Sequence, residues 1–336
     1  MTRWLRSACL CRSVASLGIY FAVLAGSAYP TFRYFDMNGA RKPGDSVDYV
    51  AIYKGHVVGN NHHRYRVLVP YLARVVPVRA MVWLVRAAAD RPVELAFFLV
   101  NFTMILASAG FMHAAMGRLG FSWKERLLGG ALFLTSIPAV QAAATPLVDA
   151  GTYLASSLML WAVVISSPAL VVCALVFGIF AREASVSLVL FALLSGRFRV
   201  RVPLGGFFVV IAMWLGFVVA FDAMDGSQVK WDMLIGVGQG MVVHSKDPAY
   251  MFSRSYIGEF VEAYVVTLPF ALVGWRFRHR LPAYVVQAAP WLLFCLALGF
   301  IVGEPGRTSF MGFPMLLPFV LLGIRRISEL RQADEL

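Results

Sequence analysis

Long apolar runs dominate this chain, and short polar segments separate them. Ten runs follow one another, near residues 13–32, 93–117, 127–144, 150–167, 168–181, 184–195, 203–221, 255–275, 281–302 and 308–324. A helix needs about 20 apolar residues to cross the ~30 Å hydrocarbon core of a bilayer. Most of the runs reach that length. The pattern therefore predicts an all-α membrane protein with about 10 transmembrane or re-entrant helices.

Two of the runs, 168–181 and 184–195, are too short to span a bilayer. They predict a half-depth hairpin over 168–195 that turns at Arg182 and Glu183. Ionised groups at such a depth are costly unless they face a protein-lined, wet cavity. Either the two residues pair with each other and cap the hairpin, or they line a ligand cavity.

The longest polar stretches are residues 33–92 and 222–254. Within the first, SVDYVAIYKG and YRVLVPYLARVVPVRAMVWLVRAAA are amphipathic and predict helices that lie in the membrane interface. No repeat or boundary divides the chain. We therefore expect a single polytopic domain over residues 1–336, with both stretches as loops on one side of the membrane.

Composition supports the membrane assignment and excludes other classes. Hydrophobic residues make up 60% of the chain, charged residues 14%, and the mean hydropathy is +0.72, well outside the range of soluble proteins. The net charge of +12 does not indicate nucleic-acid binding, because the basic residues fall in short clusters between apolar runs. The four scattered cysteines give no disulfide framework.

The basic clusters predict how the chain is oriented. If the N-terminus is inside, the inner loops carry a net charge of +11 and the outer loops +1, as the positive-inside rule requires. We expect a plasma-membrane protein (the bacterial inner membrane) with both termini cytoplasmic. Gly26-Ser27-Ala28 resembles a signal-peptide cleavage site, but removing the first run would leave an odd number of crossings.

The predicted first outer loop carries two carboxylates, Asp45 and Asp48, in GDSVDYVAIYKG. If a helix begins at Ser46, Asp45 is its N-cap and Asp48 occupies its first turn, where carboxylates accept backbone N–H bonds. Alternatively, the two share a helical face and one of them is a general base that takes a proton from an acceptor hydroxyl.

The segment HHRYR follows in the same loop. Arg64 and Arg66 offer guanidinium forks that suit phosphate oxygens, which favours the catalytic interpretation of the carboxylates. His62 and His63 are adjacent, so they diverge and make a poor metal pair. A mixed site that combines these histidines with Asp45 or Asp48 leaves a divalent metal open, although the spacing fits no named motif.

Further polar residues lie in short outer turns. Asp149 follows ATPLV, and Glu304 and Arg307 belong to GEPGRTSF. No Walker loop, dinucleotide fingerprint or HExxH sequence is present, so nothing predicts a nucleotide cofactor. The candidate chemistry is therefore confined to the outer side.

These motifs resemble the GT-C superfamily of integral-membrane glycosyltransferases. The likeness rests on GDSVDY..IYKG followed by YRVLVPYLAR, on the Pro146–Asp149 turn, on the Arg182-Glu183 hairpin and on Arg307 before a proline-rich last helix. It is topological over most of the chain and reaches residue level only in the first loop. The chain departs from the family pattern in having no second Asp-Asp or Glu motif, so metal use and acceptor class stay open.

The resemblance implies a sugar transferase whose donor is a polyprenyl-phosphate-linked sugar and whose acceptor is a glycan, lipid or protein. It implies Asp48, with Asp45 as second choice, as catalytic acid residue, and Arg182 or Arg307 at the donor phosphate. Arg64 and Arg66 are further phosphate candidates, and His63, Asp149, Glu183 and Glu304 are candidates for the cavity. The alternatives are a transporter or flippase of a lipid-linked or anionic substrate, or a structural membrane partner.

Overall fold

The computed structural model describes residues 2–34, 44–56, 62–77, 91–224, 254–302 and 305–334. These residues form helices joined by turns, with no strand among them, so the all-α prediction is confirmed for this part of the chain. The α-helices are α1 (Thr2–Tyr34), α2 (Gly44–Tyr53), α3 (Leu68–Val75), α5 (Pro92–Arg118), α6 (Trp123–Leu134), α7 (Ile137–Ala144), α8 (Asp149–Ile165), α9 (Pro168–Ala181), α10 (Leu188–Leu194), α11 (Arg201–Met224), α14 (Arg254–Tyr264), α15 (Leu268–Arg276), α16 (Ala283–Ala288), α17 (Pro290–Val302), α18 (Pro305–Ser309) and α19 (Phe313–Asp334). The short 3₁₀ helices are η1 (His62–Tyr65), η3 (Glu183–Ser187), η4 (Arg278–Arg280) and η5 (Phe310–Gly312).

Fewer helices are candidate membrane spans than the hydropathy pattern predicts. Five helical stretches in the described residues are long and apolar enough: Arg12–Tyr34, Pro92–Arg118, Arg201–Met224, Ala283–Phe300 and Gly306–Ala333. Two broken helices raise the number to seven if each counts as one span. The expected ten crossings are therefore replaced by five to seven candidate spans and several shorter helices.

Proline accounts for the two breaks. The run 127–144 divides into α6 and α7, bent by 62°, and the run 255–275 divides into α14 and α15, bent by 65°. Pro138 and Pro269 lie in the first turns of α7 and α15. Because proline has no N–H and restricts the preceding residue, it starts a helix more readily than it continues one.

Two helical arms joined by a short turn lie where the hairpin is predicted. Helix α9 covers the first arm and ends at Ala181, and η3 and α10 cover the second arm. Residues 57–61 and 78–90 lie outside the described part, so only α2 and α3 test the interfacial helices expected in the first loop. Both segments are helical.

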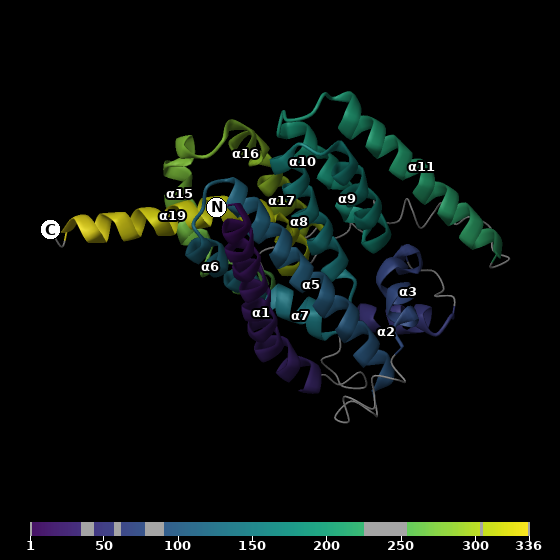
Figure 1. Ribbon diagram of the computed structural model, residues 1–336. Coiled ribbons are helices and arrows are strands. Elements are labelled where there is room, and N and C mark those ends of the chain that lie inside the picture. The colour runs from purple at the N-terminus through teal and green to yellow at the C-terminus, as the bar shows by residue number, and fades with distance from the viewer. Residues whose placement is uncertain are drawn as a thin grey trace.

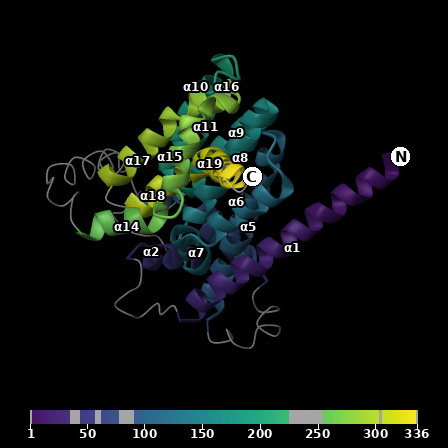
Figure 2. The same cartoon turned by 90° about the vertical axis from the view of Figure 1, so that its left-hand side faces the viewer.

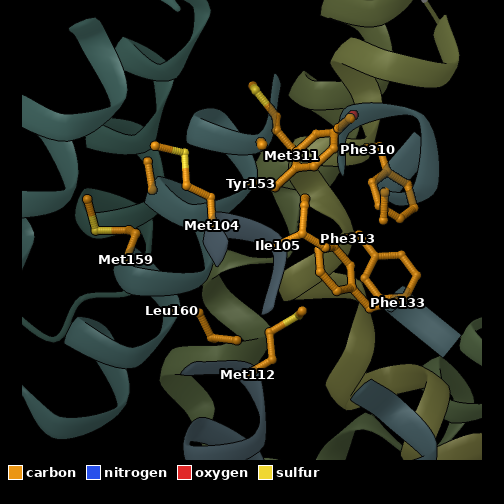
Figure 3. Packing of buried hydrophobic residues seen from close by; sticks show 14 of the residues in the cluster. Met104, Ile105, Met112, Phe133, Tyr153, Met159, Leu160, Phe310, Met311 and Phe313 are labelled. Carbon is orange, nitrogen blue, oxygen red and sulfur yellow. The ribbon is translucent and has the colours of Figure 1, made fainter. Parts of the chain in front are cut away.

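Aromatic and methionine side chains fill the core between α5, α8 and the C-terminal helices. The rings of Phe133 and Phe310 stack with centroids 5.8 Å apart, and Phe310 and Phe313 lie 4.7 Å apart. Figure 3 shows Tyr153 beside this group, with Met104, Met112 and Met159 filling the space toward α8. The last apolar run of the sequence is thus packed into the centre of the protein.

The loops between the helices gather at two ends of the molecule. In both views α10 and α16 lie at the upper end and α2 lies at the lower end (Figures 1 and 2). We call the first the arginine-rich end. There Arg325 of α19 binds Glu125 with Nε–Oε1 at 2.6 Å, Arg326 lies 4.8 Å from the Phe277 ring, and Arg197 lies 4.8 Å from the Tyr284 ring.

The other end, which we call the site end, gathers α2, η1, the start of α8, η3 and α18. The short 3₁₀ and α-helical pieces there are joined through side-chain ion pairs rather than through long helical contacts. Among the described residues, the basic turns therefore lie at one end of the fold and the residues of mixed charge lie at the other.

Two glycines let α15 and α19 approach backbone to backbone. A Cβ added at Gly274 would lie 1.8 Å from the carbonyl oxygen of Phe319, and one at Gly323 would lie 1.9 Å from that of Phe270. Small residues at such crossings are typical of helix packing in membranes, where close backbone approach supplies the van der Waals contact.

Replacing Gly323 by alanine should destabilise the protein, because the added methyl group meets a main-chain oxygen and forces the helices apart, at a cost of about 1–3 kcal/mol. Gly216→Ala is the matched control, since a Cβ there has nothing within 4 Å and helix propensity alone favours alanine by ~1 kcal/mol. Thermal unfolding of both purified variants measures the difference. Equal unfolding temperatures would show that α15 and α19 can move apart without loss of stability.

Candidate functional site

One buried carboxylate joins two arginines at the site end. Asp149, the first residue of α8, is 2% exposed. Its Oδ1 accepts a hydrogen bond from Arg182 Nη1 at 2.7 Å, and its Oδ2 accepts from Arg307 Nη2 at 2.7 Å and from Arg307 Nε at 3.1 Å. Asp149 therefore ties α8 to the end of α9 and to α18.

Close helix packing explains why Arg182 reaches Asp149. A Cβ on Gly151 would lie 2.7 Å from the Cβ of Ala181, so the first turn of α8 and the last turn of α9 touch with no room for a side chain. The residue after Ala181 then points its guanidinium at the carboxylate two residues before Gly151. The hydroxyl of Tyr153, one helical turn farther along α8, donates to the carbonyl oxygen of Arg307 at 3.0 Å.

The two aspartates of α2 continue this network. Asp45 Oδ2 lies 3.5 Å from Arg307 Nη2 and 3.9 Å from His63 Nε2. Asp48 Oδ2 lies 2.8 Å from His63 Nδ1. His63 therefore lies between the two carboxylates, with Nδ1 toward Asp48 and Nε2 toward Asp45.

The cap interpretation of these aspartates fits the structure poorly. Helix α2 begins at Gly44 and not at Ser46, so Asp45 lies in its first turn. Both carboxylates contact side chains from other elements, and their side chains are 21% and 26% exposed. Both carboxylates are therefore partly accessible from outside the protein.

A second ion pair lies next to the first. Arg66 Nε donates to Glu183 Oε2 at 2.9 Å, Arg66 Nη2 pairs with the other carboxylate oxygen, and Arg66 Nη1 donates to the Tyr49 hydroxyl at 2.9 Å. Burial alone would lower the pKa of Arg66, but the Glu183 carboxylate and Tyr49 outweigh it and raise that pKa. Burial also raises the pKa of Tyr49 well above its usual value, so Tyr49 is a neutral donor and acceptor.

One interpretation of the hairpin was that Arg182 and Glu183 pair with each other. The structure contradicts it, because each residue pairs with a different partner. Adjacent residues in extended backbone point in different directions, and the backbone at Arg182 is extended (φ −160°, ψ 131°). Arg182 turns to α8 and Glu183 turns to Arg66. The hairpin tip thus contacts α8 through Arg182 and the segment after η1 through Glu183.

Arg64 takes a different role from the one expected. It is 1% exposed, pairs with Asp222 at 2.6 Å, and lies over the rings of Tyr65 and Phe221 at 5.5 and 5.6 Å. The Tyr65 hydroxyl donates to the same carboxylate at 2.8 Å. This pair attaches η1 to α11, so we leave Arg64 out of the candidate phosphate site.

Sequence reasoning placed Asp45, Asp48, His63, Arg66, Asp149, Arg182, Glu183 and Arg307 among the candidates, and the structure brings all eight into one network. Glu304 and residues 225–253 of the second predicted loop lie outside the described residues. Three contributors were missed: Asp222, Tyr49 and Tyr153. Asp222 was assigned to a loop because it follows the end of an apolar run. Hydropathy does not distinguish a buried tyrosine that makes hydrogen bonds from any other tyrosine.

The described residues contain no group of three or more His, Cys, Asp or Glu side chains arranged to hold a metal ion. Comparisons of the chain with protein-family models, curated proteins and solved structures found no match. Function is therefore inferred from the geometry of the site.

Asp149→Asn should destabilise the protein strongly, because it leaves two arginines beside a neutral amide in a buried position. Breaking a buried ion pair from one side costs about 3–5 kcal/mol. The control is Glu329→Gln at the arginine-rich end, where the carboxylate is 44% exposed and such pairs contribute about 0–1 kcal/mol. Thermal unfolding in detergent compares the two. If Asp149→Asn were as stable as the control, the bridge would not hold the site together.

Proposed function

We propose that this protein is a membrane glycosyltransferase that moves a sugar from a polyprenyl-phosphate donor to an acceptor hydroxyl at the site end, which we orient to the outer face of the membrane. The proposal includes the GT-C resemblance and its implied donor. The observation that carries it is the position of two partly exposed carboxylates, Asp45 and Asp48, near a partly exposed arginine, Arg307, at the end of apolar helices.

The arrangement separates the two charges that such a reaction creates. The acceptor oxygen attacks the anomeric carbon with inversion while Asp48 takes the hydroxyl proton, and the bond from that carbon to the phosphate oxygen breaks. The lipid phosphate leaves with the bonding electron pair, and Arg307 stabilises its charge. The donor supplies its own leaving group, so the reaction needs no nucleotide-binding fold.

Arg307 suits the donor phosphate better than the other candidates do. Its side chain is 19% exposed, compared with 5% for Arg182, 5% for Arg66 and 1% for Arg64. Asp149 holds it by two hydrogen bonds, and Arg182 supplies additional positive charge behind the same carboxylate. We assign Arg307 to the phosphate and Arg182 to its support.

His63 is proposed to position the base. Its Nδ1 binds Asp48, and its ring lies 5.4 Å from that of Tyr49. A histidine beside both carboxylates fixes the orientation of the Asp48 side chain, much as supporting groups orient metal ligands. Asp45, which contacts Arg307, is the second choice for the base.

Asp48→Asn tests the proposal most directly. Asparagine keeps the size of the side chain but has no basic oxygen, and loss of a general base typically costs about 10²–10⁴-fold in rate. We expect normal thermal stability, strongly reduced release of polyprenyl phosphate from a panel of short-chain polyprenyl-phosphate sugars, and a milder loss for Asp45→Asn. Mass spectrometry of the lipid products measures the release.

Lys54→Gln, on the exposed end of the same segment, is the control and should transfer at the parent rate. Transfer by Asp48→Asn and Asp45→Asn at the parent rate would refute the proposed site. Movement of intact lipid-linked sugar across vesicles, with no cleavage, would instead identify a transporter or flippase.

The orientation is tested by labelling single cysteines in a variant without the native ones. His56 is exposed at the site end and Lys124 is exposed at the arginine-rich end. A membrane-impermeant thiol reagent should label His56→Cys in intact cells and Lys124→Cys only after lysis, because basic loops stay inside. Labelling of Lys124→Cys alone in intact cells would reverse the proposed topology.

A further inference from the structure

A cavity lies at the arginine-rich end, separate from the proposed transferase site. Its volume is about 470 Å³, and α1, α5 and α6 surround it. Its polar lining includes Ser13, Tyr20, His113, Arg118 and Arg126. None of these residues has a part in the proposed sugar transfer.

Small residues of α5 make room for this cavity. Gly110, Ala114 and Gly117 repeat at helical spacing along the face that lines it. A Cβ added at Gly110 meets nothing within 4 Å, whereas one at Gly117 would lie 2.7 Å from Arg126 Nη1. Gly117 therefore lets the Arg126 guanidinium lie against α5, and Gly110 borders open space.

The back of the cavity is fixed by Tyr20, which is 1% exposed. Its hydroxyl lies 2.8 Å from His113 Nδ1 and donates to the carbonyl oxygen of Arg126 at 2.8 Å. One side chain of α1 thus binds both α5 and α6. The pocket is built by tertiary contacts and is not a chance gap between helices.

The cavity is cationic. Arg118 and Arg126 line it, and no acidic residue does so in the described part of the chain. Glu125, the nearest acid in sequence, is bound by Arg325 and Ser122. Two cationic side chains with no carboxylate among the described lining residues favour an anionic ligand.

The surface beside the cavity is apolar. Leu17 lines the cavity and is 48% exposed, and Val14 and Phe21, on the same side of α1, are 62% and 56% exposed. An apolar strip on a candidate membrane span faces lipid. A ligand with a phosphate in the cavity and hydrocarbon chains along α1 satisfies both surfaces.

We infer that this cavity binds the phosphate-bearing headgroup of an anionic phospholipid, with Arg126 and Arg118 on the phosphate and the acyl chains along α1. The site is independent of the proposed transferase reaction. It fixes the arginine-rich end to one leaflet through a specific lipid in addition to the general attraction of basic loops for anionic lipid.

The experiment measures binding of phosphatidylglycerol and of phosphatidylcholine with the same acyl chains to the purified, delipidated full chain, by native mass spectrometry. We expect a clear preference for phosphatidylglycerol. Arg126→Gln should weaken that binding by about ten- to a hundred-fold, as for loss of one charge-assisted hydrogen bond. Lys124→Gln removes the same charge from the same helix at an exposed position outside the cavity, and should change binding little.

Gly110→Leu provides a second test that keeps both arginines. It fills the cavity at a position where a Cβ meets no atom within 4 Å, so the variant should fold and lose phosphatidylglycerol. Equal losses in Arg126→Gln and Lys124→Gln would overturn the site in favour of general electrostatic attraction. Binding of soluble glycerol phosphate as tightly as the lipid, with the same dependence on Arg126, would overturn the assignment to a lipid.

Discussion

The need to pair buried charges at the site end constrains the arrangement of the helices that meet there. Asp149 holds Arg182 and Arg307, which come from two other parts of the chain, and all three are largely buried. An uncompensated charge in such a position costs far more than the pair gains. Helices α8, α9 and α18 must therefore meet in one arrangement, and α2 joins them through Asp45 and Arg307.

The short segment after α2 extends this network because its neighbouring residues reach different partners. His63 binds Asp48, Arg64 and Tyr65 bind Asp222 of α11, and Arg66 binds Glu183 and Tyr49. A 3₁₀ helix points successive side chains about a third of a turn apart, so four consecutive residues can face several helices. The fixed network leaves only Asp45, Asp48, Glu183 and Arg307 partly exposed, and this limits where chemistry can occur.

Different interactions hold the arginine-rich end together. There the arginines lie on aromatic rings or on exposed carboxylates, and glycines let the helices touch. Contacts of this kind hold helix ends together while leaving cationic surface exposed toward lipid headgroups. The proposed catalytic site and the proposed lipid site thus lie at opposite ends of one set of candidate spans.

The sequence by itself determined the helical class, the membrane environment and the division into basic and mixed-charge loops, because hydropathy and charge are local properties that the bilayer reads directly. It also indicated charged residues that the structure brings together at the site end, since charges beside apolar runs are costly unless they are paired or face water. Only the tertiary structure decided which charge meets which: Arg182 with Asp149, Glu183 with Arg66, and Arg64 with Asp222. The hydropathy pattern also predicted single helices where proline divides the chain into two. It placed Asp222 in a loop, whereas Asp222 is buried in α11. Which charges pair depends on where side chains from distant helices point. Close contacts between helices, such as that of Gly151 with Ala181, set those directions, and no local sequence pattern predicts such contacts.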